Sequence, residues 1–102
     1  MKQSDQKREM EAAAERVSAL MKTLGHKDRL LVLCNLAEGE RAVGELAYEL
    51  NLSQSSLSQH LARMRNQGLV ETRRESQTIY YSLSDGDVRE LIRSLYTIFC
   101  PK

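Results

Sequence analysis

The features that would indicate a membrane protein or an enzyme are missing from this sequence. No apolar run approaches the roughly 18 residues that a membrane-spanning helix needs. The first segment, MKQSDQKREMEAAAERV, is charged throughout and has no secretory apolar stretch, which predicts a cytoplasmic protein. There is no phosphate loop, no metal-ligand cluster and no carboxylate pair in a pocket-forming context. We therefore expect neither an enzyme nor a bound cofactor.

The net charge is also low, at +1 over 102 residues, but the charged residues are unevenly distributed. A chain of this length predicts one domain, 1–102, with a thin core that an oligomer would help to stabilise. The region 53–74 has a local balance of +3, four arginines minus one glutamate. Its charged side chains are Arg63, Arg65, Arg73, Arg74 and Glu71. Such a basic face on a nearly neutral protein would bind phosphates without making the whole surface bind nonspecifically.

The most informative stretch of the chain, residues 42–83, contains two short helical patterns separated by a tight turn. The first helix is predicted over Val43–Leu50, and Asn51 and Leu52 make the turn. Ser53 is a good N-cap for the second helix, because its hydroxyl can accept a hydrogen bond from a free backbone N–H of the next turn. The stretch thus predicts a helix-turn-helix unit.

The second of these helices has one apolar stripe and one polar face. Leu57, Leu61 and Met64 form the stripe, at positions i, i+4 and i+7. The other face carries short, neutral or basic side chains that can read base edges in the major groove of DNA. On this helix and its cap, the residues expected to contact DNA are Ser53, Gln54, Ser55, Ser58, Gln59, His60 and Arg63.

A basic β-hairpin is predicted directly after this helix. Its strands, Leu69–Arg74 and Gln77–Leu83, are rich in β-formers and alternate in polarity. Arg73 and Arg74 precede the tip and are further expected DNA contacts. Together with the helix pair, the hairpin indicates a winged helix-turn-helix. This pattern favours DNA binding over an ordinary αα-hairpin beside a solvated β-hairpin.

Amphipathic helices flank this unit on both sides. The stripes are Met10, Ala14, Val17, Met21 and Leu24 in the first helix, and Val88, Leu91, Ile92, Leu95, Ile98 and Phe99 in the last. Between the first helix and the unit, a helix is predicted over Lys27–Ala37, with Leu30, Leu33, Cys34 and Ala37 inward. Gly25 would end the first helix, and Ser84 or Asp85 would cap the last. Since the winged unit needs only about residues 26–83, we expect the terminal helices to pair in a two-fold dimer rather than to thicken a monomer core.

Three segments make the chain resemble the ArsR/SmtB family of small dimeric bacterial repressors. They are LGHKDRLLVLCNL (24–36), GELAYELNLSQSSLSQHLARMRNQGLV (44–70) and SQTIYYSL (76–83). The resemblance implies a mainly α fold with a β-hairpin wing, in the order α-α-α-α-β-β-α. It also implies operator DNA as the partner, dimerisation through the first and last helices, and repression relieved by an inducer. Lys27 and Ser76 depart from the proline and glycine frequent there in the family.

The metal sites that the family often carries do not fit this sequence. The thiol site of the family resembles ELCVCDL, and the corresponding residues here are 40–46, with Ala42 and Gly44 in place of the cysteines. On the last helix Asp87 is present, but no histidine or glutamate follows near Ile98. The only histidines are His26, expected at a helix start, and His60, expected at DNA. We therefore expect no metal site of the usual kind.

The two cysteines, Cys34 and Cys100, remain as candidate sensing residues. Cys34 lies in LVLCNL and Cys100 in YTIFCP. This placement resembles the BigR/SqrR/HlyU/YgaV group of the family, and implies a redox switch that responds to persulfides, polysulfides or oxidants. Without the resemblance, Cys34 could equally be a small buried hydrophobe and Cys100 a chance terminal residue. A sensor of a metal or other ligand at a non-standard site, or a winged-helix module that binds protein, stay open as alternatives.

Overall fold

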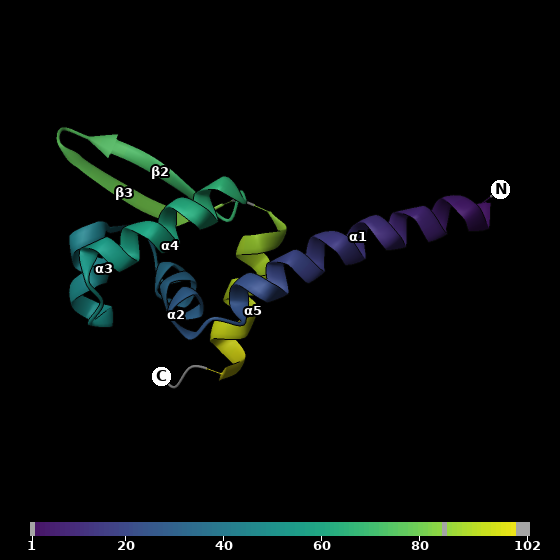
Figure 1. Ribbon diagram of the computed structural model, residues 1–102, viewed down its shortest axis with the longest axis horizontal. Helices are drawn as coiled ribbons and strands as arrows, with labels where there is room; N and C mark the ends of the chain where they lie inside the picture. Colours follow the sequence, from purple (N-terminus) through teal and green to yellow (C-terminus); the bar gives the residue numbers. More distant parts are fainter. Residues whose placement is uncertain (1, 85, 100–102) are drawn as a thin grey trace. The chain divides into compact units, whose positions relative to one another are not determined.

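The computed structural model describes residues 2–84 and 86–99, and the chain divides into two compact units, residues 1–30 and 31–102. Figure 1 shows the elements in chain order. They are α1 (Lys2–Leu24), α2 (Lys27–Leu36), β1 (Arg41–Ala42), α3 (Val43–Leu50), α4 (Gln54–Asn66), β2 (Val70–Glu75), β3 (Thr78–Leu83) and α5 (Asp87–Phe99). No helix among the described residues combines the length and the apolar character needed to cross a membrane.

The first unit consists of α1 and the first turn of α2. As predicted, α1 ends just before Gly25, whose N–H donates to the carbonyl of Met21 at 2.9 Å. The start of α2 is tied back to this end, because Arg29 Nε donates to the carbonyl of Thr23 at 2.9 Å. Along α1, Met10 is 71 % exposed and Val17 is 47 % exposed. The apolar stripe predicted for this helix therefore faces solvent over much of its length.

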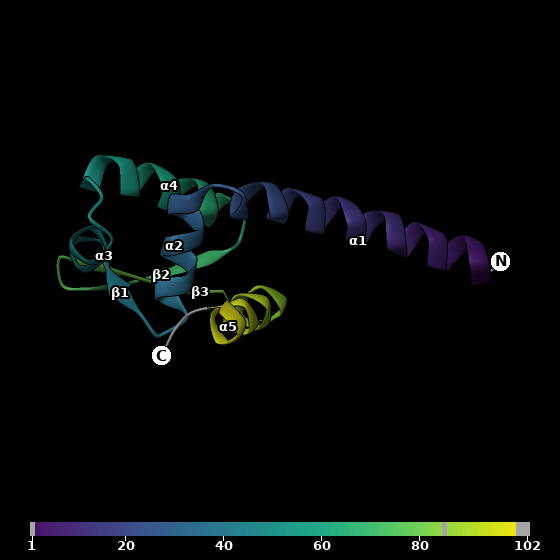
Figure 2. The ribbon, with the colours of Figure 1, turned by 90° about the horizontal axis from the view of Figure 1, so that it is seen from below.

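The second unit is a winged helix-turn-helix, which confirms the predicted fold class. Its core is built from one face of each helix and from the base of the hairpin. The buried apolar residues are Val32, Leu33, Leu36, Leu46, Ala47, Leu57, Leu61, Met64, Leu69, Val70, Leu83, Val88 and Ile92. In Figure 2, α3 is seen nearly end-on while α4 runs across the view, so the two helices cross.

The wing is a hairpin in a three-stranded antiparallel sheet of order β1-β3-β2. Val70 pairs with Leu83 at the buried base, and Glu75 pairs with Thr78 next to the tip. At the tip Ser76 has a left-handed backbone, with φ 59°. This conformation explains why glycine suits that position, since glycine adopts positive φ without steric cost. Figure 1 shows β2 and β3 side by side as a long hairpin.

Two details differ from the sequence-based expectations. The predicted order lacked β1, which pairs with β3 through Arg41 opposite Tyr81. The hairpin strands begin one residue later than predicted, because the N–H of Leu69 still belongs to the end of α4 and donates to the carbonyl of Met64 at 2.9 Å. The proposed cap Asp85 lies outside the described residues, and Ser84 donates its N–H to the carbonyl of Leu69 at 3.0 Å.

The inward face of α2 was also predicted incompletely. Val32, Leu33 and Leu36 are the residues of this helix that are buried, whereas Cys34 and Ala37 are only half-buried. The helix is short, and both of its sides carry apolar side chains. Its sequence therefore does not fix which side faces the core.

Candidate DNA-binding surface and thiol site

The recognition helix α4 is positioned by its cap and by its apolar stripe. Ser53 has an extended backbone, and its Oγ accepts a hydrogen bond from the N–H of Ser56 at 3.1 Å, as the sequence predicted. Leu57, Leu61 and Met64 are fully buried at 0 % exposure, so the helix cannot rotate without exposing them. The opposite face is thereby held outward.

The turn between α3 and α4 is set by Asn51. Its backbone is left-handed, with φ 55° and ψ 47°, and asparagine tolerates this conformation better than most residues. The N–H of Leu52 donates to the carbonyl of Ala47 at 3.0 Å, which closes the end of α3. Chain reversal at this residue places α3 and α4 in contact.

The outward face of α4 carries the residues predicted to contact DNA. Its described side chains are Ser53, Gln54, Ser55, Ser58, Gln59 and Arg63, all exposed, and His60, which is half-buried. Neutral donors and acceptors therefore surround the start of the helix, and Arg63 adds positive charge nearer its end. Such a face can form hydrogen bonds with base edges and phosphates.

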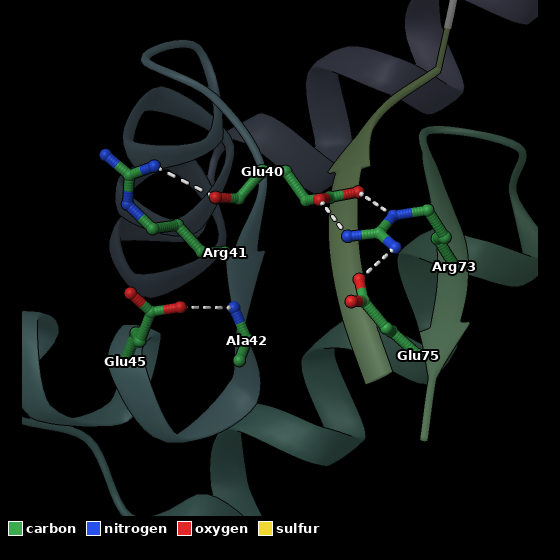
Figure 3. Close-up of polar contacts among 6 residues, drawn as sticks. All are labelled: Glu40, Arg41, Ala42, Glu45, Arg73 and Glu75. Atoms are coloured by element: carbon green, nitrogen blue, oxygen red, sulfur yellow. Dashed lines mark hydrogen bonds and ion pairs between the residues drawn. The ribbon is translucent and has the colours of Figure 1, made fainter. Parts of the chain in front are cut away.

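The two wing arginines are placed very differently. Arg73 donates from Nε and Nη2 to the two carboxylate oxygens of Glu40, at 3.0 and 2.8 Å. Its Nη1 donates to Glu75 at 2.6 Å, and its guanidinium lies 4.8 Å from the ring centroid of Tyr80. Figure 3 shows Arg73 between the two carboxylates. By contrast, Arg74 is exposed and forms no ion pair within residues 2–84 and 86–99.

The electrostatic effect of this cluster is mutual. The hydrogen bond from Arg73 holds the pKa of the Glu40 carboxyl below its usual value. The hydrogen bonds to Glu40 and then to Glu75 raise the pKa of Arg73. Glu40 was missed by sequence reasoning, because its partner lies 33 residues away and is brought to it only by the pairing of β1 with β3.

The first residues of α3 occupy the positions where the family's thiol metal site would lie. Ala42 precedes α3, and its N–H donates to Glu45 Oε1 at 3.0 Å (Figure 3). Gly44 is exposed in the first turn. The carboxylate of Glu45 thus serves to cap this helix, because it accepts a hydrogen bond from a backbone N–H.

Cys34 lies in α2 and is half-buried, whereas Cys100 lies outside the described residues. Next to Cys34, Asn35 Nδ2 donates to Glu49 Oε2 of α3 at 2.9 Å. From α5, the hydroxyl of Tyr96 donates to Glu38 Oε1 at 2.7 Å. Sequence reasoning did not identify these polar contacts.

Arg41 lies between those two contacts. Its Nη2 is 3.5 Å from Glu38 Oε2, and its Nε is 4.0 Å from Glu49 Oε1. A series of polar groups therefore connects α5, the segment after α2, and α3 of the helix-turn-helix.

Comparison with known proteins agrees with this geometry. The model for the family "Bacterial regulatory protein, arsR family" matches residues 26–72. The biofilm growth-associated repressor of Xylella fastidiosa is 46 % identical over 92 residues, which are 90 % of this chain and 81 % of the relative. This chain belongs to the ArsR family.

Two further relatives are informative. The transcriptional activator HlyU of Vibrio cholerae is 46 % identical over 90 % of this chain and 85 % of its own length. The structure of reduced HlyU superposes with a TM-score of 0.85 at 45 % identity, and covers 92 % of this chain and 99 % of that one. A third relative is a possible ArsR-family regulator from Mycobacterium bovis, whose structure is described as a homodimeric winged helix-turn-helix DNA-binding domain. It superposes with a TM-score of 0.76 at 32 % identity, and the match covers 87 % of this chain and 82 % of the relative.

Membership of the ArsR family fixes the general activity. The relatives are transcriptional regulators rather than enzymes, and the family binds operator DNA. The chain is therefore a DNA-binding transcriptional regulator related to the Xylella repressor and to HlyU.

Proposed function

We propose that this regulator is a cytoplasmic, homodimeric repressor whose operator affinity is changed by thiol chemistry at Cys34 and Cys100. The observation that carries the proposal is the half-buried thiol of Cys34 beside Asn35, whose amide donates a hydrogen bond to Glu49 of the helix-turn-helix. A change at this thiol is thus one residue away from a contact with the DNA-binding unit. The naming of one HlyU structure as the reduced form supports a redox signal in this group of relatives.

The chemistry of the switch begins at a thiolate. Cys34 attacks a sulfane sulfur of a polysulfide, forms a persulfide and releases the shortened polysulfide as the leaving group. Cys100 reacts in the same way. The terminal sulfur of one persulfide then attacks the inner sulfur of the other, which forms a trisulfide bridge and releases hydrosulfide. The sulfane sulfur of the inducer is reduced, and the two thiols are oxidised.

A bridge with an inserted sulfur would also give selectivity. A direct disulfide needs Cα atoms about 4.4–6.8 Å apart. If α2 and α5 hold the thiols farther apart than this, a trisulfide would close the gap without strain while peroxide would stop at a sulfenic acid. The switch would then respond to reactive sulfur in preference to peroxide.

The dimer is proposed to form through α1 and α5, the two terminal dimerisation helices of a single winged domain. In α1, Met10 and Val17 are exposed, and in α5, Ile98 is 69 % and Phe99 is 75 % exposed. Apolar residues repeated along a helix face are stabilised when a second copy covers them. The homodimeric relative from Mycobacterium bovis supports this arrangement. Two copies of α4 would then meet the two halves of a pseudo-palindromic operator.

Base contacts are proposed for the outward face of α4, with Gln54, Ser55, Ser58, Gln59 and His60 at base edges and Ser53 and Arg63 at phosphates. Their exposure on the face opposite the buried stripe supports this assignment. Arg74 is proposed as a phosphate contact from the wing.

The test combines intact mass and DNA affinity on the same samples. The reduced dimer is treated with polysulfide, peroxide or oxidised glutathione, and binding to a genomic operator fragment is measured before and after. We expect polysulfide to add a mass equal to one inserted sulfur less two hydrogens within one chain, with a fall in affinity. Cys34→Ser and Cys100→Ser should each bind DNA as the untreated wild type does and ignore the inducer. An unbridged product, or a bridge with unchanged affinity, would exclude the switch and leave a ligand sensor or a protein-binding module.

A further inference from the structure

The adjacent wing residues Arg73 and Arg74 lie on opposite faces of the sheet. Side chains alternate along a strand, so Arg74 shares the face of Val70, which is buried in the core at the base of the hairpin. Arg73 lies on the other face and is directly opposite Tyr80 in the register. Val70 and the apolar stripe of α4 are both buried in the core, and β2 contacts α4. We therefore infer that the face that carries Arg74 is turned toward the recognition helix.

Each nitrogen of the Arg73 guanidinium already donates a hydrogen bond to a carboxylate. The bonds to Glu40 and Glu75 are 2.6 to 3.0 Å long, and the face of the guanidinium lies over Tyr80. One arginine and two carboxylates have a combined charge of −1. A phosphate that approached Arg73 would have to displace a bidentate carboxylate and would meet net negative charge.

The position of Glu40 gives this cluster a structural role. Glu40 immediately precedes β1, and the residue after β1 begins α3. The backbone connects β1 to β2 only through β3, because the strand order is β1-β3-β2. The side-chain pair between Glu40 and Arg73 therefore spans the sheet above Tyr80 and joins the wing to the start of the helix-turn-helix (Figure 3). The strand β1 has only two residues, so its backbone pairing alone gives little restraint.

We propose that Glu40 is a positioning residue that holds Arg73 as a brace across the sheet, and that Arg74 alone supplies the phosphate contact of the wing. The brace fixes the wing relative to α3. It thereby keeps Arg74 on the DNA side while Arg73 faces its carboxylates. This division of roles between neighbouring arginines does not depend on the thiol chemistry proposed above.

The experiment compares the same substitution at the two neighbouring positions. Binding of the reduced full-length protein to a mixed-sequence duplex of 30 base pairs is measured from low to high salt, for the wild type, Arg73→Gln and Arg74→Gln. Each phosphate contact contributes about 0.9 to the slope of log affinity against log salt concentration. We expect Arg74→Gln to reduce that slope by about 0.9 for each subunit that contacts DNA. Arg73→Gln should lower affinity while leaving the slope unchanged.

A second measurement tests the brace directly. Amide hydrogen exchange of residues 78–83 in the free protein should become faster in Glu40→Gln and in Arg73→Gln, and it should be no faster in the double variant than in Arg73→Gln. Arg74→Gln is the matched control and should exchange as the wild type does. The proposal is overturned if Arg73→Gln lowers the salt slope as Arg74→Gln does, if Arg74→Gln leaves the slope unchanged, or if Glu40→Gln leaves hairpin exchange unchanged.

Discussion

The N-cap of α4 offers a way to separate the stability of the recognition helix from its contact with DNA. The hydroxyl of Ser53 accepts one hydrogen bond, from the N–H of Ser56 at 3.1 Å. Replacing it with alanine removes this acceptor, and such losses cost about 1 kcal/mol in proteins. Because Ser53 is exposed and water can reach the start of the helix, we expect a cost near that value rather than at the upper end of the range. In a domain of this size, about 1 kcal/mol corresponds to a fall in Tm of about 4–8 °C.

Ser53→Asp is the informative partner of Ser53→Ala. Aspartate also accepts a hydrogen bond at an N-cap, and its charge is favourable at the positive end of the helix. Its Tm should therefore equal or exceed that of the wild type. At the same time, a carboxylate at the end that faces the phosphates should repel DNA. A like-charge contact of this kind costs about 1–3 kcal/mol, or roughly a 5- to 150-fold loss of affinity.

The assays are thermal unfolding by circular dichroism and operator binding at fixed salt. For the thermal measurement, Ser58→Ala at an exposed position within the same helix is the control for a lost serine hydroxyl that does not cap. The reasoning fails if Ser53→Asp lowers Tm as much as Ser53→Ala, because the cap would then not be the source of the effect. It fails equally if Ser53→Asp binds DNA as tightly as the wild type, because the start of α4 would then lie away from the phosphates.

Two further predictions concern the dimer and base recognition. Leu95→Glu should place an unpaired charge in the proposed interface at a cost of several kcal/mol, so sedimentation at micromolar concentration should show a monomer. Thr97→Glu, at an exposed position on the opposite side of α5, is the control and should stay dimeric. A monomeric wild type would refute the interface. Gln59→Ala should cost about 1–3 kcal/mol in the free energy of operator binding and relax specificity at one base pair. Ser55→Ala should do the same if Ser55 contacts a base. Unchanged affinity and specificity in both variants would refute the assignment of the recognition face.

The helix-turn-helix could be predicted from the sequence because its signals are local. A cap hydroxyl at Ser53, an asparagine that tolerates a left-handed backbone at Asn51, and an apolar residue at every helical turn all act within a few residues. Each of these signals describes the same two helices; the structure has α3 at its predicted bounds and begins α4 directly after the predicted cap Ser53. The predicted face of α4 is also outward, since the stripe that opposes it is fully buried.

The brace in the wing could not be predicted because it depends on non-local pairing. A two-residue strand has no periodicity, so β1 left no pattern in the sequence. Without β1, nothing placed Glu40 near Arg73, and both wing arginines were assigned to DNA from their charge and their position near the hairpin tip. The charge of a side chain is fixed by the sequence, but its availability depends on which carboxylates the fold brings to it.

The energetics of the proposed switch limit which contacts can carry it. A hundredfold change in operator affinity requires about 2.7 kcal/mol of difference between two states. The contacts of Asn35 with Glu49 and of Tyr96 with Glu38 are exposed, and a single interaction of this kind contributes about 0–1 kcal/mol. Neither contact alone is large enough. The side chain of Ile92 in α5 is fully buried, and removing such a side chain from the core costs about 1.5–3 kcal/mol. A bridge that displaces the end of α5 would therefore act chiefly by shifting the packing of this helix. The polar contacts from Tyr96 to Glu49 would then transmit that shift from α5 to the helix-turn-helix.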